Sequence, residues 1–248
     1  MATIIRVAGA DFSANPVGFM PPVAANLLAW HYLGGDLTNS ARNLAPGGAN
    51  ATVVGSPTVE TSHLRCSSTA YIQSTIEDES DCTLIAVAKM PSGFTFSTAA
   101  AGGWMVSAFG TNGTGMYLKK SGTAEPASVP RVVGYYSIAG TPTYQQVDAP
   151  TTTNVSANWH MFIGKFVGGT GATMTNKTTG QTNTVSSAEA KYNLSGNLFR
   201  FGASAGGVVD PIDMAFAAIY GRALTGTEET AVYLAVQAYL DRRFSITI

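Results

Sequence analysis

The sequence predicts an all-β fold, a two-sheet antiparallel sandwich that is followed by one C-terminal helix. Short runs rich in β-branched and aromatic residues recur along the chain, and clusters of Gly, Asn, Pro and Ser separate them. The 248 residues are enough for one large sandwich domain, and the 45% of them that are apolar are enough for a sizeable core. Only residues 226–243 change to helical spacing.

Nine short runs have the composition of strands, and turn-forming residues lie between them. They are residues 51–54, 64–66, 70–75, 83–90, 104–109, 116–119, 131–138, 159–167 and 199–203. In LIAVAKM (84–90) both alternating sets of side chains are apolar, which predicts a central strand that is covered on both faces. Two Thr-rich arms flank residues 176–180, which predicts a polar hairpin at a sheet edge.

The chain closes with a strand and a helix. Apolar side chains occupy every second position in 212–220, Phe216 among them, which predicts a strand with one buried face. Thr225 and Glu228 match a capping box, in which each side chain bonds the backbone amide of the other residue. Because one helix cannot cover two sheets, we expect residues 226–243 to pack at an edge or an end of the sandwich.

The chain divides into an extended arm, residues 1–26, and one domain, residues 27–248, which includes the helix. Gly and Pro interrupt the arm, and its one β-prone segment is TIIRV (3–7). Two interpretations stay open. The arm is either a terminal strand at the sandwich edge or an attachment segment that adds to the sheet of a neighbouring subunit.

The surface is expected to be neutral. Charged residues make up 12% of the chain, about half of the roughly 25% that is usual for soluble domains. The formal net charge is −1, and no run of Lys and Arg is longer than a pair, so nothing indicates a nucleic-acid partner. Such a surface suits a protein that is part of an assembly or lies outside a cell.

The first residues lack the apolar core of a signal peptide, and no stretch reaches the length of a membrane span. We therefore expect synthesis in a cytoplasm and no insertion into a membrane. Cys66 and Cys82 are the only cysteines, and a disulfide between neighbouring strands stays open. Two cysteines without a CxxC motif do not form a zinc site.

Nothing in the sequence indicates catalysis. A glycoside hydrolase needs two carboxylates roughly 5–9.5 Å apart, and the dense acidic stretch that contains Glu77, Glu79 and Asp81 is better interpreted as a solvated turn. The histidines, which are His31, His63 and His160, each adjoin an apolar run and are interpreted as structural. Neither a GxSxG nor an HExxH motif occurs.

The best candidate for ligand binding is a loop that ends in polar residues. Recognition of a sugar needs an exposed aromatic ring beside amide or carboxylate groups. Tyr135 and Tyr144 flank a Gly- and Pro-containing turn, and polar side chains follow at Gln145, Gln146 and Asp148.

Other aromatic residues are expected in the core. Tyr136 shares its parity with Val132 and Ile138, which predicts a buried side chain. Trp30, Trp104 and Trp159 lie in apolar strands and are expected to fill the sandwich.

Four segments, taken in order, resemble laminin-G-like and concanavalin-A-like lectin jelly rolls. They are LLAWHYLGGDLTNSARNLAPGGANATVVGSPTVE (27–60), YIQST with CTLIAVAKM (71–75 and 82–90), NWHMFIGKFVGGTGATMTNKTTG (158–180) and YGRALTGTEETAVY (220–233). The chain also resembles phage or prophage tail-associated virion proteins, because it shares with them an N-terminal arm, a neutral surface and the lack of a signal peptide.

These resemblances imply three functions. The first is a non-enzymatic structural protein of a virion, attached through residues 1–26 to other tail proteins and forming a homo-oligomer, in particular a trimer. The second is a lectin module that binds a carbohydrate or a host receptor, and the third is a glycoside hydrolase. No cofactor is expected. Calcium is the ion that the lectin family binds, and the candidate ligands for it in this chain are Asp36 with Asn39, or Asp210 with Asp213.

Overall fold

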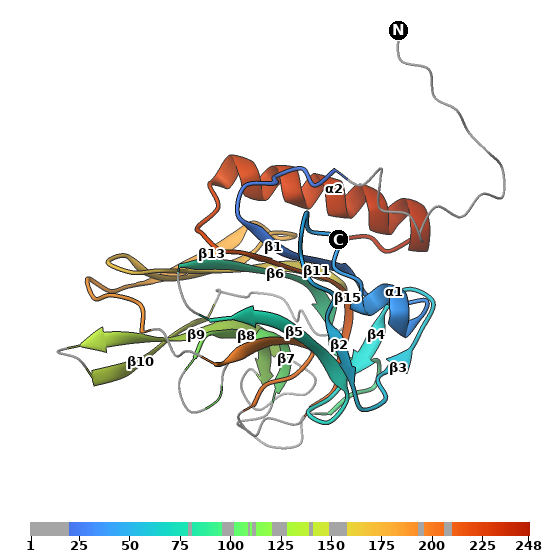
Figure 1. Cartoon of the computed structure of the whole chain (residues 1–248), viewed down its shortest axis with the longest axis horizontal. Helices are drawn as coiled ribbons and strands as arrows, with labels where there is room; N and C mark the ends of the chain where they lie inside the picture. The colour runs from blue at the N-terminus through green and yellow to red at the C-terminus, as the bar shows by residue number, and fades with distance from the viewer. Residues whose placement is uncertain are drawn as a thin grey trace, which may run out of the picture.

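The computed structural model describes residues 20–78, 81–95, 102–108, 110, 113–120, 128–138, 141–148, 158–192, 196–205 and 210–248. Two antiparallel sheets pack face to face, and a long helix lies on the outer face of one of them (Figure 1). The predicted fold class is confirmed: the chain is an antiparallel two-sheet jelly-roll sandwich of the concanavalin-A type that ends in a helix.

The first sheet has the strand order β13-β12-β11-β6-β15-β4-β3, and β1 also pairs with β15. Its strands are β1 (Leu27–Tyr32), β3 (Thr58–Val59), β4 (Leu64–Cys66), β6 (Cys82–Lys89), β11 (His160–Val167), β12 (Gly171–Asn176), β13 (Gln181–Ser186) and β15 (Ile212–Tyr220). β6 is central and buried on both faces, as predicted. The Thr-rich hairpin is β12 and β13, and β13 forms the polar edge, as predicted.

The second sheet has the strand order β10-β9-β8-β7-β14-β5-β2. Its strands are β2 (Thr52–Val54), β5 (Tyr71–Glu77), β7 (Gly102–Ser107), β8 (Gly115–Lys120), β9 (Ser128–Ile138), β10 (Thr141–Asp148) and β14 (Leu198–Phe201). The helices are the five-residue α1 (Leu37–Ala41) and the long α2 (Gly226–Phe244).

The core between the sheets consists of large apolar side chains that both sheets contribute. Phe162 and Phe166 come from β11, Phe199 and Phe201 from β14, and Leu84 from β6, and each is at most 1% exposed. Burying such a side chain stabilises the fold by about 1.5–3 kcal/mol. This core aligns the two sheets.

The closing strand β15 differs from the prediction of one buried face, because all nine of its residues are buried. A register shift against β6 lies between Met214 and Phe216, which is a β-bulge. The extra residue changes the parity of the strand. Ile212 and Met214 therefore point into the core between the sheets, whereas Phe216 and Ala218 point to the opposite face.

The helix α2 covers that opposite face, and so the prediction that it packs at an edge or an end is wrong (Figure 1). Its buried residues Val232, Val236 and Leu240 contact an apolar layer on the first sheet, which we call the helix-facing cluster. The cluster also contains Trp30, Ile85, Val87, Met161, Ile163, Phe216, Ala218 and Tyr220. An apolar outer face of this width must be covered, and the helix is the element that covers it.

The start of α2 is fixed by polar contacts. The Thr225 side chain accepts from the amide of Glu228, and Glu228 returns a bond to the amide of Thr225, so the predicted capping box is confirmed. The Glu228 carboxylate also accepts two bonds from Arg222, at 2.6 and 2.9 Å. Farther along, buried Glu229 binds Lys165 of β11 at 2.7 Å, which ties the helix to the sheet beneath it.

The two cysteines are buried and unbonded, and burial raises the pKa of each thiol to about 12. Residues 1–19 of the predicted arm lie outside the described residues. Val23 is buried in the helix-facing cluster, and its carbonyl oxygen accepts from the Tyr220 hydroxyl at 3.1 Å. In the part of the chain that the structure describes, no helix is both long and apolar enough to span a bilayer.

Replacing Phe216 with Asp should prevent soluble folding. Phe216 is fully buried, with its ring 4.8 Å from that of Trp30 and 5.4 Å from that of Tyr32. Loss of the ring alone costs about 3–5 kcal/mol, and an unpaired buried charge adds to this, against a total stability of about 5–15 kcal/mol. Soluble yield and circular dichroism measure the result. Leu234→Asp, at a helix position that is 56% exposed, is the control and should fold normally. A Phe216→Asp protein that melts like the parent would show that the face assigned to this residue is wrong.

Candidate binding surface on the second sheet

The outer face of the second sheet is the face turned away from the first sheet, and polar and aromatic side chains meet there. Met116 and Val147 point inward to the core, so their neighbours along the strands point outward, and a register shift between Trp104 and Val106 turns Trp104 to the same outer face. One outward row crosses β7, β8, β9 and β10. It consists of Trp104, Tyr117, Arg131 and Asp148, which are aligned by strand pairing.

Arg131 is the centre of a polar network on this face. Its Nε and Nη2 donate to the two oxygens of Asp148, the latter at 2.9 Å, and its Nη1 donates to Gln146 Oε1 at 2.6 Å. The Tyr144 hydroxyl donates to the same Gln146 oxygen at 3.0 Å. Lys119 Nζ lies 3.1 Å from Asp148 Oδ2. The network holds these side chains in one arrangement before any ligand is present.

The charge of Asp148 depends on these partners. Partial burial raises the pKa of its carboxyl group, but the bonds from Arg131 and Lys119 outweigh that effect and keep the pKa below its usual value. Partial burial also lowers the pKa of Arg131, and again the ion pair outweighs it. At neutral pH the surface therefore presents a paired carboxylate and guanidinium.

Trp104 and Tyr117 form an aromatic base next to this network. Their rings stack with centroids 4.5 Å apart and planes inclined by 27°. A Cβ on Gly115 would meet the Trp104 ring at 2.6 Å and Ser107 Oγ at 2.7 Å, so the absence of a side chain there makes room for the indole. Trp104 thus lies on the outer face and Trp30 lies beneath α2, which corrects the prediction that they fill the space between the sheets. Trp159 is half-buried and packs edge-on against His63.

The structure brings together three of the five predicted binding residues. Tyr144, Gln146 and Asp148 share the outer face, and Tyr144 is 42% exposed. Gln145 has the opposite parity and lies on the side of buried Val147. Tyr135 pairs with Tyr144 across β9 and β10, and its side chain lies outside what the structure describes.

The segment that was predicted as a loop is the strand β10, and this explains why Gln145 lies on the face opposite to Tyr144, Gln146 and Asp148. A strand sends alternate side chains to opposite faces, so an unbroken run of candidates cannot share one surface. Sequence reasoning missed Arg131, Tyr117 and Lys119. The available signal was that Arg131 precedes the buried Val132 in one strand, so its side chain points outward. Its pairing with Asp148 follows only from the register of the β9–β10 hairpin. Tyr136 is fully buried, as predicted.

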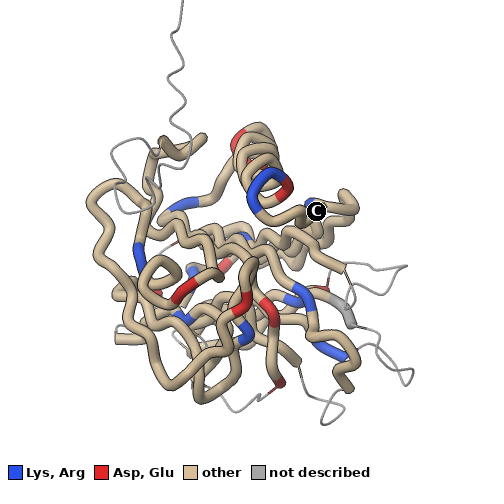
Figure 2. Tube along the Cα trace, turned by 90° about the vertical axis from the view of Figure 1, so that its right-hand side faces the viewer, with Lys and Arg blue, Asp and Glu red and all other residues tan. Residues whose placement is uncertain are grey.

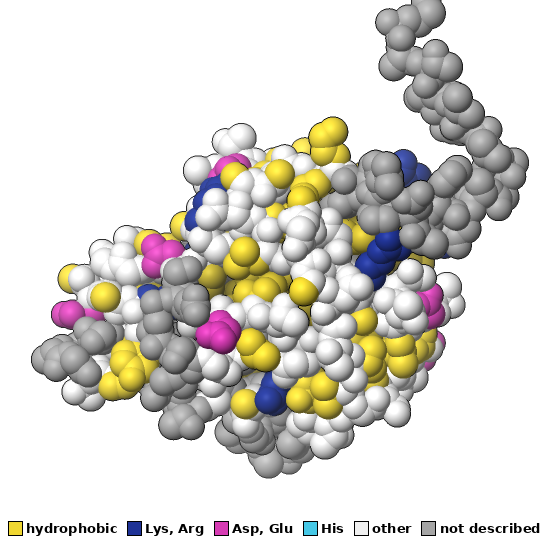
Figure 3. All heavy atoms as spheres, in the orientation of Figure 1, with side chains coloured by type: hydrophobic (Ala, Val, Ile, Leu, Met, Phe, Trp, Pro, Cys, Tyr) yellow, Lys and Arg dark blue, Asp and Glu magenta, His cyan; other side chains and the backbone are white. Residues whose placement is uncertain are grey.

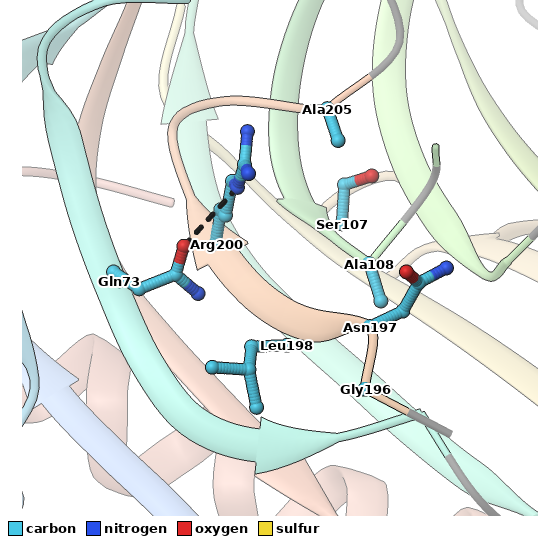
Figure 4. A pocket seen from close by; sticks show the side chains of 8 residues that line it. All are labelled: Gln73, Ser107, Ala108, Gly196, Asn197, Leu198, Arg200 and Ala205. Carbon is cyan, nitrogen blue, oxygen red and sulfur yellow. Dashed lines mark hydrogen bonds between the residues drawn. The ribbon is translucent and has the colours of Figure 1, made fainter. Parts of the chain in front are cut away.

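A cavity of about 130 Å³ lies farther along the same sheet, among β5, β7 and β14. Its polar side chains are Gln73, Ser107, Asn197 and Arg200 (Figure 4). Strand pairing places Arg200 opposite both Gln73 and Ser107, and its Nε donates to Gln73 Oε1 at 3.2 Å. Gln73 is oriented in turn by its Nε2, which donates to the carbonyl oxygen of Phe199 at 3.0 Å.

The histidines occupy structural positions. His31 is 1% exposed, and its Nδ1 donates to the carbonyl oxygen of Ser40 at 3.0 Å. His160 is buried beside Asn176. His63 Nε2 lies 3.5 Å from Asp213 Oδ2, but Arg65 binds both oxygens of that carboxylate.

The acidic stretch does not form a paired carboxylate site among the described residues. Glu77 accepts from the amide of Gly196, and Asp81 accepts from the amide of Gly168. Asp78, between them, is buried in an ion pair with Lys191. Glu79 lies outside the described residues.

The two predicted calcium pairs are used in other ways. Asp36 caps α1 by accepting from the backbone and the side chain of Asn39, at 2.7 and 2.6 Å. Asp213 is held by Arg65, and Asp210 is buried. Across the described ranges, no group of three or more His, Cys, Asp or Glu side chains is arranged to hold a metal ion.

The architecture defines a two-sheet β-sandwich, and several solved structures that are similar to it are binding domains. The binding domain of Paraclostridial Mosquitocidal Protein 1 superposes with a TM-score of 0.59 and 15% identity, over 86% of this chain and 52% of that one. The receptor-binding domain of botulinum neurotoxin mosaic serotype C/D gives 0.58 and 11%, over 85% and 51%. The ligand-binding domain of serotype D in complex with N-acetylneuraminic acid gives 0.56 and 12%, over 85% and 51%.

These likenesses show a shared fold. This chain spans about half the length of each of these binding domains. No family model matches the chain, and neither does any curated protein.

Acid should destabilise the protein partly through His31. Burial lowers the pKa of this imidazole from 6.5 to about 4, so the unfolded chain binds the extra proton between these values. The free energy of unfolding should therefore decrease as the pH falls from 6.5 towards 4, by about 2 kcal/mol between pH 7 and pH 5. Urea unfolding at both pH values measures it.

The matched variant is His31→Gln, whose amide can donate to the same carbonyl but does not titrate. Its loss of stability between pH 7 and pH 5 should be smaller than that of the parent. Equal losses in the two proteins would mean that His31 does not carry the effect.

Proposed function

We propose that the protein is a non-enzymatic module that binds a carbohydrate or a glycosylated receptor on the outer face of the second sheet. The observation that carries the proposal is the network of Tyr144, Gln146, Arg131 and Asp148, in which an exposed ring lies beside ordered donors and acceptors. α2 covers the outer face of the first sheet. The second sheet therefore offers the outer face on which polar and aromatic groups gather.

The chemistry of this network suits a sugar. A sugar ring has apolar C–H faces that pack on an aromatic ring, and hydroxyl groups that need both donors and acceptors at fixed positions. Tyr144 supplies the ring, while Gln146, Arg131 and Asp148 supply both kinds of polar group. Because the side chains already hold one another, little conformational entropy is lost when a ligand binds.

The comparisons support a binding role over a catalytic one. The toxin structures with this fold are binding domains, and one of them is in complex with N-acetylneuraminic acid. Fold likeness alone does not transfer a ligand, so the proposal rests on the side chains of this chain. A glycoside hydrolase would require a carboxylate pair, and the acidic residues described above are bonded to backbone amides or to Lys191.

A glycan array with the purified protein tests the proposal. We expect reproducible binding to a restricted set of glycans, and about tenfold weaker binding after Tyr144→Ala, because the exposed ring is lost. Tyr144→Phe keeps the ring and should retain most of the affinity. Leu234→Ala, on the exposed side of α2, is the control and should bind like the parent. No binding across a broad array would refute the lectin function.

A second candidate is a structural protein of a virion, which a different observation favours. Lys and Arg positions are interspersed with Asp and Glu positions over the described part of the chain (Figure 2). On the face drawn in Figure 3 charged groups are few, and apolar groups are scattered among neutral polar ones. Such a surface suits close contact with other subunits. In this proposal residues 1–26 attach the protein to tail proteins, and the protein is a homo-oligomer, in particular a trimer.

Removal of residues 1–19 tests this second candidate. Light scattering should show a lower molecular mass for the shortened chain, while its melting temperature should stay within a few degrees of the parent. An unchanged mass would remove the support for assembly through this segment. A large fall in the melting temperature would instead identify it as part of the sandwich.

A further inference from the structure

Arg200 differs from Arg65, Arg131 and Arg222 because, among the described residues, no carboxylate binds it. Arg65 bonds both oxygens of Asp213, and Arg131 bonds both oxygens of Asp148. Arg222 bonds both oxygens of Glu228 in the same way. In the described part of the chain, Arg200 has one hydrogen bond, from Nε to Gln73, and its guanidinium lies over the Tyr71 ring at 4.9 Å.

These two contacts orient the guanidinium without neutralising it. The bond to Gln73 uses one of the five N–H donors of the group, and the ring contact uses its face. Both Nη atoms therefore have no hydrogen-bond acceptor among the described residues, and Arg200 lines the cavity among β5, β7 and β14. An arginine held in this way is arranged to form two parallel bonds with a planar anion such as a carboxylate.

The cavity has the groups and the size for such an anion. Ser107, Asn197 and Gln73 line it together with Arg200, and the exposed Gly196 and Ala205 lie at its rim (Figure 4). Its volume of about 130 Å³ holds a carboxylate and part of a sugar ring but not a large ligand. The Glu77 carboxylate accepts from the amide of Gly196, and the hydrogen bond of Arg200 goes to Gln73 instead.

Strand pairing relates the cavity to the proposed sugar surface along one row of the second sheet. Strand pairing aligns Arg200 with Ser107, then Gly115, Val133 and Gln146 on successive strands. Four strand spacings of about 4.8 Å place the Arg200 and Gln146 positions about 19 Å apart. A ligand that reaches both must be an oligosaccharide, with its anionic group at one end.

We propose that the cavity around Arg200 is a subsite for the carboxylate of an acidic sugar, so that the protein selects glycans that carry a uronic acid or another carboxylated residue. This inference rests on the proposed glycan-binding function and adds the chemical class of the ligand. Arg200 binds the carboxylate, and Ser107 and Asn197 contact the sugar atoms next to it. Neutral glycans lack the group that this subsite recognises.

The direct test uses two sugars that differ only at one carbon, methyl glucuronide and methyl glucoside, titrated into the full chain and followed by NMR. We expect glucuronide binding at least tenfold tighter than glucoside binding, and loss of that preference in Arg200→Gln. Arg242→Gln on the exposed surface of α2 is the matched control and should keep the preference. Circular dichroism and the melting temperature check that each variant is folded, and Ser107→Ala, which leaves the guanidinium in place, should weaken glucuronide binding less.

A titration with acetate distinguishes recognition of an acidic sugar from binding of carboxylates in general. If acetate binds as tightly as glucuronide, the cavity takes carboxylates in general and the assignment to an acidic sugar is overturned. Equal binding of glucuronide and glucoside, or an unchanged preference in Arg200→Gln, also overturns the inference.

The glycan array separates this inference from the function on which it rests. Array binding to neutral and acidic glycans alike, sensitive to Tyr144→Ala but not to Arg200→Gln, would support the lectin function and refute the acidic subsite. A glucuronide preference lost in Arg200→Gln, without binding on the array, would support the subsite and refute the wider surface.

Discussion

The rest of the structure depends on the burial of β15 on both of its faces. The bulge between Met214 and Phe216 sends one set of side chains between the sheets and the next set beneath α2. One strand thereby joins the three layers, and it pairs with β1, β4 and β6 within its own sheet. Because every residue of this strand is buried, an unpaired polar substitution on either of its faces disrupts a packed interface.

This packing makes the two outer faces of the sandwich different. The outer face of the first sheet is apolar and is covered by α2, whereas the outer face of the second sheet carries ordered polar groups. A partly buried ion pair stabilises a fold only when its hydrogen bonds are satisfied, and Arg131 meets this condition with Asp148, Gln146 and Tyr117. No carboxylate of the described residues binds Arg200, and for that reason it is the described group on this face that is best arranged to bind an external anion.

The proposed binding surface and the proposed carboxylate subsite are parts of one sheet, and they use different physical interactions. Near Tyr144 an exposed ring and a closed network would recognise the shape and the hydroxyl groups of a sugar. Near Arg200 a guanidinium that no described carboxylate binds would recognise the negative charge of the ligand. In a chain with 12% charged residues, a guanidinium in a cavity that no described carboxylate binds has a large effect on selectivity for an anion.

Local patterns were sufficient for the strands, for the Thr225 cap and for the fold class, because dihedral preferences and hydrophobic periodicity act over a few residues. Tyr144, Gln146 and Asp148 were also found from the sequence, and the period of a strand explains why Gln145 is separated from them. Tertiary structure alone decided the place of α2, the change of parity within β15 and the partners of the site. Gln73 and Arg200 are 127 residues apart, and their contact exists because strand order and register bring β5 and β14 together, which no local pattern encodes.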